Sequence, residues 1–177
     1  DETQVIAGSE TITYYNNAPE PLTYLWLQLD QNIEAKGNMT QSTKTNTLRD
    51  SIPAKYLVSQ LGETGYPGGF TIQSVKDAKG SPLPTLINHT MMRIDLPAPL
   101  KSGEKVTFSI EWTYNILDRM VGGNNSRGGM EFFPGDKNYI YTIAQWFPRM
   151  CVFDHYEGWQ NKQFLDNGEF TLTFGDY

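Results

Sequence analysis

The 177-residue chain has few cysteines, few histidines and no surplus of positive charge. Cys151 is its only cysteine, so a disulfide within the chain is impossible, and its apolar neighbours predict a buried structural thiol. The formal net charge is -6, and no cluster of Lys or Arg stands out. Because binding to phosphates depends on a surplus of these residues, we expect no nucleic-acid partner.

The two histidines, His89 and His155, lie far apart in the sequence. Neither belongs to an H-E-x-x-H helix or to a set of Cys and His with metal-ligand spacing, so we predict no metal ligand in this chain. Serine nucleophile elbows and phosphate-binding loops are missing too, and we predict no catalytic residue. No apolar stretch approaches the ~20 residues that span a bilayer, so no transmembrane segment is expected.

Aromatic residues, in contrast, make up 13% of the chain, and 16 glycines and 10 prolines interrupt it. This composition favours many short strands joined by turns, and we expect an all-β fold. Residues 106–115 alternate between apolar and polar, which predicts a half-buried strand, whereas residues 22–29 are apolar on both faces, which predicts a central strand. Similar patterns predict strands at residues 10–15, 70–75, 92–96, 139–144 and 169–174.

The connections between these runs carry three further predictions. The short, turn-forming link between residues 10–15 and 22–29 predicts a β-hairpin. Residues 33–49 are polar and predict a long surface loop, followed by weak helical periodicity over residues 51–61. Residues 121–136 contain five glycines and predict an irregular, exposed loop. Because the strand at 169–174 comes so close to the last residue, we also expect the chain to be a fragment of a longer protein.

The most unusual stretch is residues 144–154, which combine three aromatic residues with a proline, Arg149 and Asp154. One interpretation is a corner of the core, where Arg149 and Asp154 satisfy buried polar groups by pairing. The other is a rigid shelf that presents Gln145 or Asp154 to a ligand.

Several segments in this part of the chain have the order expected of one known family. They are Ala144-Gln145, then Met150-Cys151-Val152-Phe153-Asp154, then a strand with Phe near its end at 169–174. Together with the early strands at residues 5–12 and 22–29, they resemble the amino-terminal domain of aminopeptidase N-type zinc metallopeptidases, the family with H-E-x-x-H catalysis. The Gln-Trp-Phe-Pro-Arg-Met version looks similar to a bacterial branch of that family.

The resemblance implies a saddle-shaped, mostly antiparallel β-sheet or sandwich domain with long loops, covering residues 1–177. Such a domain packs on a thermolysin-like catalytic domain of the same polypeptide, which lies outside this chain. Zn²⁺ is expected in the parent protein and no cofactor in this fragment, which alone should be inactive. Bacterial cytoplasm, periplasm and cell envelope all remain open as locations.

The resemblance also implies a contact with the amino terminus of a peptide substrate, because a Gln or Glu in this segment of the family binds the free α-amino group. A terminal ammonium donates hydrogen bonds and carries positive charge, so an oxygen acceptor must meet it. The usual position holds Phe147, which leaves Gln145 as the first candidate and Glu131 as the second. Glu131 lies in Gly-Gly-Met-Glu-Phe, which looks like the family's Gly-x-Met-Glu-Asn motif but precedes the aromatic segment and ends in Phe132, so a loop role is favoured.

Two other functions remain open from the sequence. The first alternative is a carbohydrate- or protein-binding β-sandwich module that uses exposed tryptophans as stacking platforms. The second alternative is an inactive peptidase-like scaffold. The binding module predicts that Trp146 and Trp159 are both exposed to solvent, whereas the aminopeptidase domain buries at least one of them.

Overall fold

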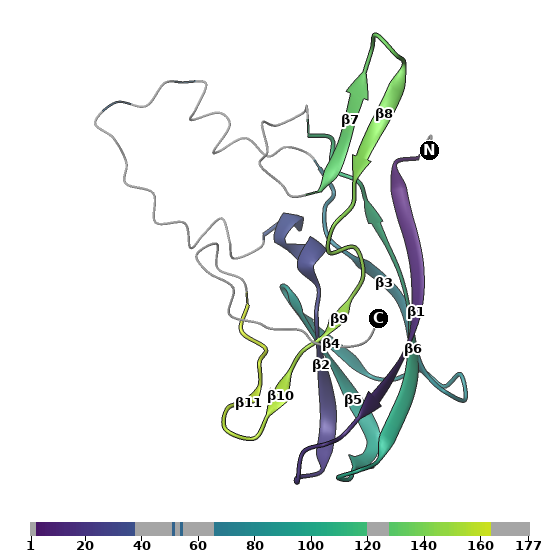
Figure 1. Ribbon diagram of the computed structural model, residues 1–177, viewed down its shortest axis with the longest axis vertical. Coiled ribbons are helices and arrows are strands. Elements are labelled where there is room, and N and C mark those ends of the chain that lie inside the picture. Colours follow the sequence, from purple (N-terminus) through teal and green to yellow (C-terminus); the bar gives the residue numbers. More distant parts are fainter. Residues whose placement is uncertain (1–2, 38–50, 52–53, 55–65, 120–127, 164–177) are drawn as a thin grey trace.

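The computed structural model describes residues 3–37, 51, 54, 66–119 and 128–163 (Figure 1). The elements in these ranges are strands and one short 3-10 helix, so the all-β prediction is confirmed. In chain order they are β1 (Val5–Tyr15), β2 (Leu22–Gln28), η1 (Asp30–Glu34), β3 (Thr71–Asp77), β4 (Thr85–Asn88), β5 (Met91–Leu100), β6 (Lys105–Asn115), β7 (Gly129–Phe133), β8 (Asn138–Thr142), β9 (Arg149–Met150), β10 (Phe153–Asp154) and β11 (Gly158–Trp159). Within the described ranges, no helix is long and apolar enough to cross a membrane.

The strands form two main sheets and two small ribbons. One sheet has the order β1-β6-β3 and the other β4-β5-β2-β9, and every pairing between these strands is antiparallel. The ribbons are β7-β8, which extends from one end of the molecule in Figure 1, and β10-β11. The expectation of mostly antiparallel sheets is therefore confirmed.

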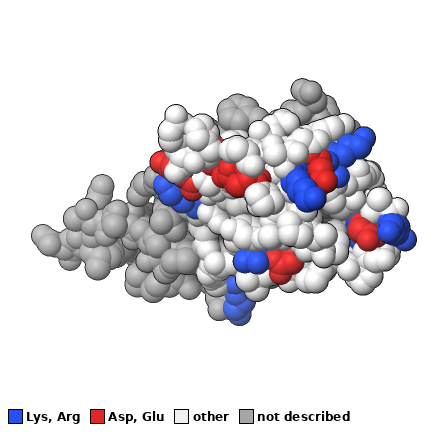
Figure 2. All heavy atoms as spheres, turned by 90° about the horizontal axis from the view of Figure 1, so that it is seen from below, with Lys and Arg blue, Asp and Glu red and all other residues white. Residues whose placement is uncertain are grey.

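Acidic and basic side chains lie close together in small groups on the face seen in Figure 2, on a surface that is otherwise uncharged. Two pairs on exposed side chains are Arg93–Asp95 at 2.7 Å and Lys76–Glu111 at 4.0 Å. Exposed pairs of this kind contribute only about 0–1 kcal/mol each, so these charges do little to hold the fold together.

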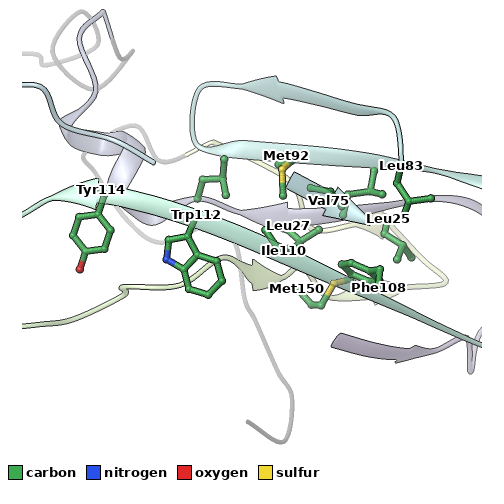
Figure 3. Packing of buried hydrophobic residues seen from close by; sticks show 12 residues of the cluster. Leu25, Leu27, Val75, Leu83, Met92, Phe108, Ile110, Trp112, Tyr114 and Met150 are labelled. Carbon is green, nitrogen blue, oxygen red and sulfur yellow. The ribbon is translucent and has the colours of Figure 1, made fainter. Parts of the chain in front are cut away.

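The core consists of side chains from both main sheets (Figure 3). Phe108, Ile110 and Trp112 of β6 are at most 1% exposed and belong to one cluster with the fully buried Leu25 and Leu27 of β2. Burying side chains of this size stabilises the fold by roughly 1.5–3 kcal/mol each. Hydrophobic burial between the sheets therefore determines their arrangement.

Strand β6 behaves as its sequence pattern predicts. Its apolar residues are buried or half-buried, while Glu111 on the opposite face is exposed. The strand lies between β1 and β3, and its pairing with β1 runs without interruption from Val5 opposite Asn115 to Tyr15 opposite Lys105. β2 likewise lies between β5 and β9, as expected of a central strand.

The predicted hairpin of residues 10–15 and 22–29 is wrong. β1 pairs with β6, whereas β2 pairs with β5 and β9, so the two runs belong to different sheets. Asn16, which is fully buried, directs this crossing by donating to the carbonyls of Glu20 (2.8 Å) and Leu100 (2.9 Å). The crossing lets the apolar sides of β1 and β2 contribute to one shared core, which pairing within one sheet would prevent.

Residues 121–136 are not a purely irregular loop either, because β7 occupies Gly129–Phe133. β7 pairs with β8, and Phe132 packs against Tyr139 across the ribbon with ring centroids 4.8 Å apart. The high glycine content obscured this strand in the sequence. β5 also continues beyond its predicted end at Pro97, as far as Leu100. Its pairing with β2 is irregular between Leu22 and Tyr24, and prolines are accepted at such irregular positions of a strand.

The polar segment 33–49 begins with the last residues of η1 rather than with a loop. The rest of that segment from residue 38 on, the weak helix at 51–61 except residues 51 and 54, and the strand at 169–174 lie outside the described residues.

Candidate functional site

The segment from Ala144 to Cys151 leaves β8, crosses the end of the core and joins β2 as strand β9. Arg149 and Met150 pair with Gln28 and Leu27, and the amide of Cys151 donates to the carbonyl of Trp26 at 2.9 Å. The carboxyl end of the segment is therefore held by regular strand pairing.

The amino end of the segment is held by side chains instead. The Nε2 of Gln31, on η1, donates to the carbonyl oxygens of Ala144 (2.9 Å) and Gln145 (3.1 Å). The indole Nε1 of the buried Trp112 donates to the next carbonyl, that of Trp146, at 3.1 Å. Three successive carbonyls thus accept hydrogen bonds from two elements that are far away in the sequence.

Gln145 has a φ of 51°, in the left-handed region that disfavours residues with a Cβ. This conformation costs roughly 1–2 kcal/mol for such a residue. The two hydrogen bonds from Gln31 contribute about 0.5–1.5 kcal/mol each, which is enough to offset that cost. Among the described residues, no hydrogen bond engages the side-chain amide of Gln145, which is half-buried and leaves its oxygen available as an acceptor.

Arg149 anchors the same segment through an ion pair with Asp30, which is the residue directly before Gln31 in η1. The Asp30 Oδ2 lies 2.7 Å from Nη2 and 2.9 Å from Nε of Arg149, and Oδ1 accepts from Gln28 at 2.8 Å. The Asp30 side chain is 3% exposed and that of Arg149 24%. Removing one partner of such a pair leaves an uncompensated buried charge, so both ends of the segment depend on η1.

Asp154 takes no part in this ion pair. It accepts hydrogen bonds from the backbone amides of Tyr156 and Glu157, both at 2.9 Å, and from Nε2 of Gln160 at 2.8 Å. The bonds from Glu157, Gln160 and Tyr156 hold the pKa of the Asp154 carboxyl below its ordinary value. The expectation that Arg149 and Asp154 satisfy buried polar groups is therefore correct for Arg149 alone, since Asp154 stabilises the turn between β10 and β11.

Glu131 lies on β7, where its Oε1 is 3.1 Å from Nη1 of Arg119. The neighbouring Gly129 has a φ of 144°, and a Cβ there would lie 2.6 Å from the carbonyl oxygen of Leu117. This glycine permits the close approach of residues 117–119 to β7, a structural role for the Gly-Gly-Met-Glu-Phe stretch. Glu131 is thus paired with Arg119, whereas the backbone carbonyl of Gln145 is bonded to Gln31, so the two sequence candidates have different partners.

The two tryptophans that could form a stacking platform differ in exposure. Trp146 is 40% exposed and contacts the rings of Trp112 and Phe147, at centroid distances of 6.1 and 5.2 Å. Trp159 is half-buried and packs between Tyr14 (5.8 Å) and Phe153 (5.2 Å). Of these two tryptophans, only Trp146 therefore offers an exposed aromatic face.

No group of three or more His, Cys, Asp or Glu that could hold a metal ion occurs within the described ranges. Cys151 is 3% exposed, and burial raises the pKa of its thiol to about 12, with a further increase from Asp30 and an opposing effect of Arg149. His155, the histidine of this region, stacks on Tyr156 with ring centroids 4.0 Å apart. This region offers a hydrogen-bonded backbone, an amide acceptor and the exposed aromatic rings of Trp146 and Tyr156, an arrangement that suits binding.

The sequence singled out Gln145 and Glu131 but missed Gln31, Asp30 and Trp112. Gln31 and Asp30 lie in a polar stretch without any recognisable motif, and Trp112 belongs to a regular core pattern. Only the pairing of β9 with β2 would have indicated that η1 reaches residues 144–149.

The chain therefore has a mostly antiparallel all-β fold in which residues 144–151 are held by hydrogen bonds from η1, β2 and β6. No family model matches the chain, and no curated protein matches it either. Among solved structures, the chain is similar to an M1 zinc metallopeptidase from Deinococcus radiodurans, with 15% sequence identity over 72% of this chain and a TM-score of 0.39. The similarity covers 19% of that metallopeptidase, so the present chain spans about a fifth of its length.

Proposed function

We propose that residues 1–177 are the amino-terminal domain of a zinc-dependent aminopeptidase, which packs on the catalytic domain of the same polypeptide. In this proposal the domain helps to shape the pocket for the peptide amino terminus. It is itself not catalytic, and the zinc belongs to the catalytic domain. The proposal rests first on the family resemblance of the segments from Ala144 to Asp154.

One structural observation supports a binding role for this segment. Gln145 is held in a left-handed conformation, its two flanking carbonyls accept hydrogen bonds, and its own side-chain amide is left without a partner among the described residues. An amide oxygen in such a position can accept a hydrogen bond from an α-ammonium group. Gln145 is therefore the first candidate for the amine contact, and Glu131, which is already paired with Arg119, is the second.

The test compares Gln145→Ala with Glu131→Ala in the full-length parent protein, using aminoacyl anilides as substrates. Loss of a hydrogen bond to a charged group costs roughly 1.5–3 kcal/mol, so we expect Gln145→Ala to raise KM about 10-fold or more with little change in kcat. A larger effect of Glu131→Ala would transfer the role to the second candidate. If neither variant changes KM, the proposed amine contact is wrong.

The second candidate function is a carbohydrate- or protein-binding module, for which Trp146 offers an exposed ring, while the half-buried Trp159 does not meet the expectation that both tryptophans are exposed. This function predicts that Trp146→Ala abolishes binding of the isolated chain to an oligosaccharide array or a protein partner, and that the full-length protein hydrolyses no aminoacyl anilide. Hydrolysis by the full-length protein would favour the aminopeptidase instead.

A further inference from the structure

We infer that Gln31 is a positioning residue, which fixes the direction of the Gln145 side chain by holding the peptide groups on both sides of it. This inference deepens the proposed function, because it rests on Gln145 as the amine acceptor. Gln31 itself does not contact the substrate.

The geometry of the two hydrogen bonds carries the inference. The carbonyl of Ala144 belongs to the peptide plane before the Gln145 Cα, and the carbonyl of Gln145 belongs to the plane after it. Both accept from the same Nε2 group, at 2.9 and 3.1 Å. Two planes held from one donor fix φ and ψ of the residue between them, and these two angles set the direction of its Cα–Cβ bond.

The conformation of Gln145 explains why such a holder is needed. At a φ of 51°, a residue with a Cβ is less stable than in the common regions. Without the two hydrogen bonds, Gln145 would relax toward a negative φ, and its side chain would turn away from its present direction.

Gln31 is itself held on both sides. Asp30 is anchored by Arg149, and the buried Asn32 donates to the carbonyl of His89 and accepts from the amide of Phe70, both at 2.7 Å. These contacts of the two neighbours hold the backbone of Gln31 in place within η1.

The test uses Gln31→Glu in the full-length protein, a nearly isosteric change that removes both donors and places a carboxylate near two carbonyl oxygens. We expect KM for an aminoacyl anilide to rise roughly 10-fold, with kcat and zinc content nearly unchanged. The matched control is Gln73→Glu, since Gln73 makes an exposed bond to Thr113 Oγ1 at 2.7 Å, far from the segment in sequence. The control should stay within about 2-fold of wild type.

A double-mutant cycle separates positioning from a general structural effect. If Gln31 acts through Gln145, Gln31→Glu should add no further increase in KM once Gln145→Ala is present. Additive effects of the two changes on KM would overturn the inference. If Gln145→Ala raises KM but Gln31→Glu does not, the inference is also wrong, while the proposed function stays intact. If neither change affects KM, the amine contact itself is wrong.

A crystal structure of the Gln31→Glu variant gives a readout that does not depend on activity. We expect Gln145 to leave the positive-φ region in this variant, and retention of the present φ would overturn the inference. Gln31→Met, which removes the donors without adding charge, allows the same comparison if the glutamate variant does not fold.

Discussion

Replacing Gly8 by alanine tests how the core supports residues 144–151. Gly8 lies opposite Trp112 in the pairing of β1 with β6, and a Cβ there would lie 2.6 Å from Cζ2 and 2.7 Å from Cε2 of the indole. The φ of Gly8 is not in the left-handed region, so the effect of the added methyl group is steric.

The size of the effect follows from two contributions. Trp112 is 1% exposed, and inserting a methyl group into a well-packed core costs typically about 1–3 kcal/mol. The displaced indole would also weaken its hydrogen bond to the Trp146 carbonyl, which contributes about 0.5–1.5 kcal/mol. We therefore expect Gly8→Ala to lower the free energy of unfolding by about 1–4.5 kcal/mol.

Urea unfolding, followed by circular dichroism and tryptophan fluorescence, measures this change, and thermal unfolding should show a loss of roughly 2–4 °C per kcal/mol for a chain of this size. Gly135→Ala is the matched control, because a Cβ at that glycine meets nothing within 4 Å. Trp112→Phe provides a second check, since the smaller ring should reduce the cost of Gly8→Ala. Equal stability of Gly8→Ala and wild type, or an undiminished cost beside Phe at 112, would refute the reasoning.

Three further predictions concern charged and reactive groups. Arg149→Met should cost roughly 3–5 kcal/mol in urea unfolding, because it removes the guanidinium that pairs with the buried carboxylate of Asp30, and adding Asp30→Asn should recover part of this loss; an unchanged stability would contradict the role of the pair. Burial raises the pKa of Glu10 from 4.5 to about 7 and leaves its Oε1 without a hydrogen bond, so the folded state binds more protons between these pH values and stability falls as pH rises through the window. Glu10→Gln should therefore gain more stability over wild type at pH 8 than at pH 4.5, measured by thermal unfolding, and an equal difference at both pH values would show the assignment to be wrong. Cys151, with a pKa of about 12, should react with a thiol reagent at pH 8 only as fast as the chain unfolds, whereas a rapid, stoichiometric reaction of the folded chain would show that the thiol is accessible.

The sequence predicted the strands with regular periodicity but not their partners. The alternation over residues 106–115 identified β6, and the apolar run over residues 22–29 identified β2 as central. The partner of β1 is β6, about a hundred positions further along the chain, and no local pattern encodes that distance. The predicted hairpin was wrong because a short connection favours neighbouring strands, whereas burial of both apolar faces required two sheets.

The candidate site was predictable only in part, for the same reason. The unusual composition of residues 144–154 pointed to this segment, and in the structure the backbone of Gln145 is held there with an available side-chain amide. Its role in binding an amine stays a prediction. Gln31 and Trp112 escaped notice because their function arises from contacts across more than thirty positions of sequence, and a non-glycine residue at positive φ leaves no mark in the sequence.

The most direct test of the account measures zinc in the full-length parent protein, alongside release of the amino-terminal residue from aminoacyl anilides with and without a chelator. We predict about one zinc per chain, turnover that the chelator abolishes, and neither zinc nor turnover in the isolated chain of residues 1–177. Absence of both zinc and turnover in the full-length protein would contradict the proposed function, and stoichiometric zinc in the isolated chain would contradict the placement of the metal in the catalytic domain.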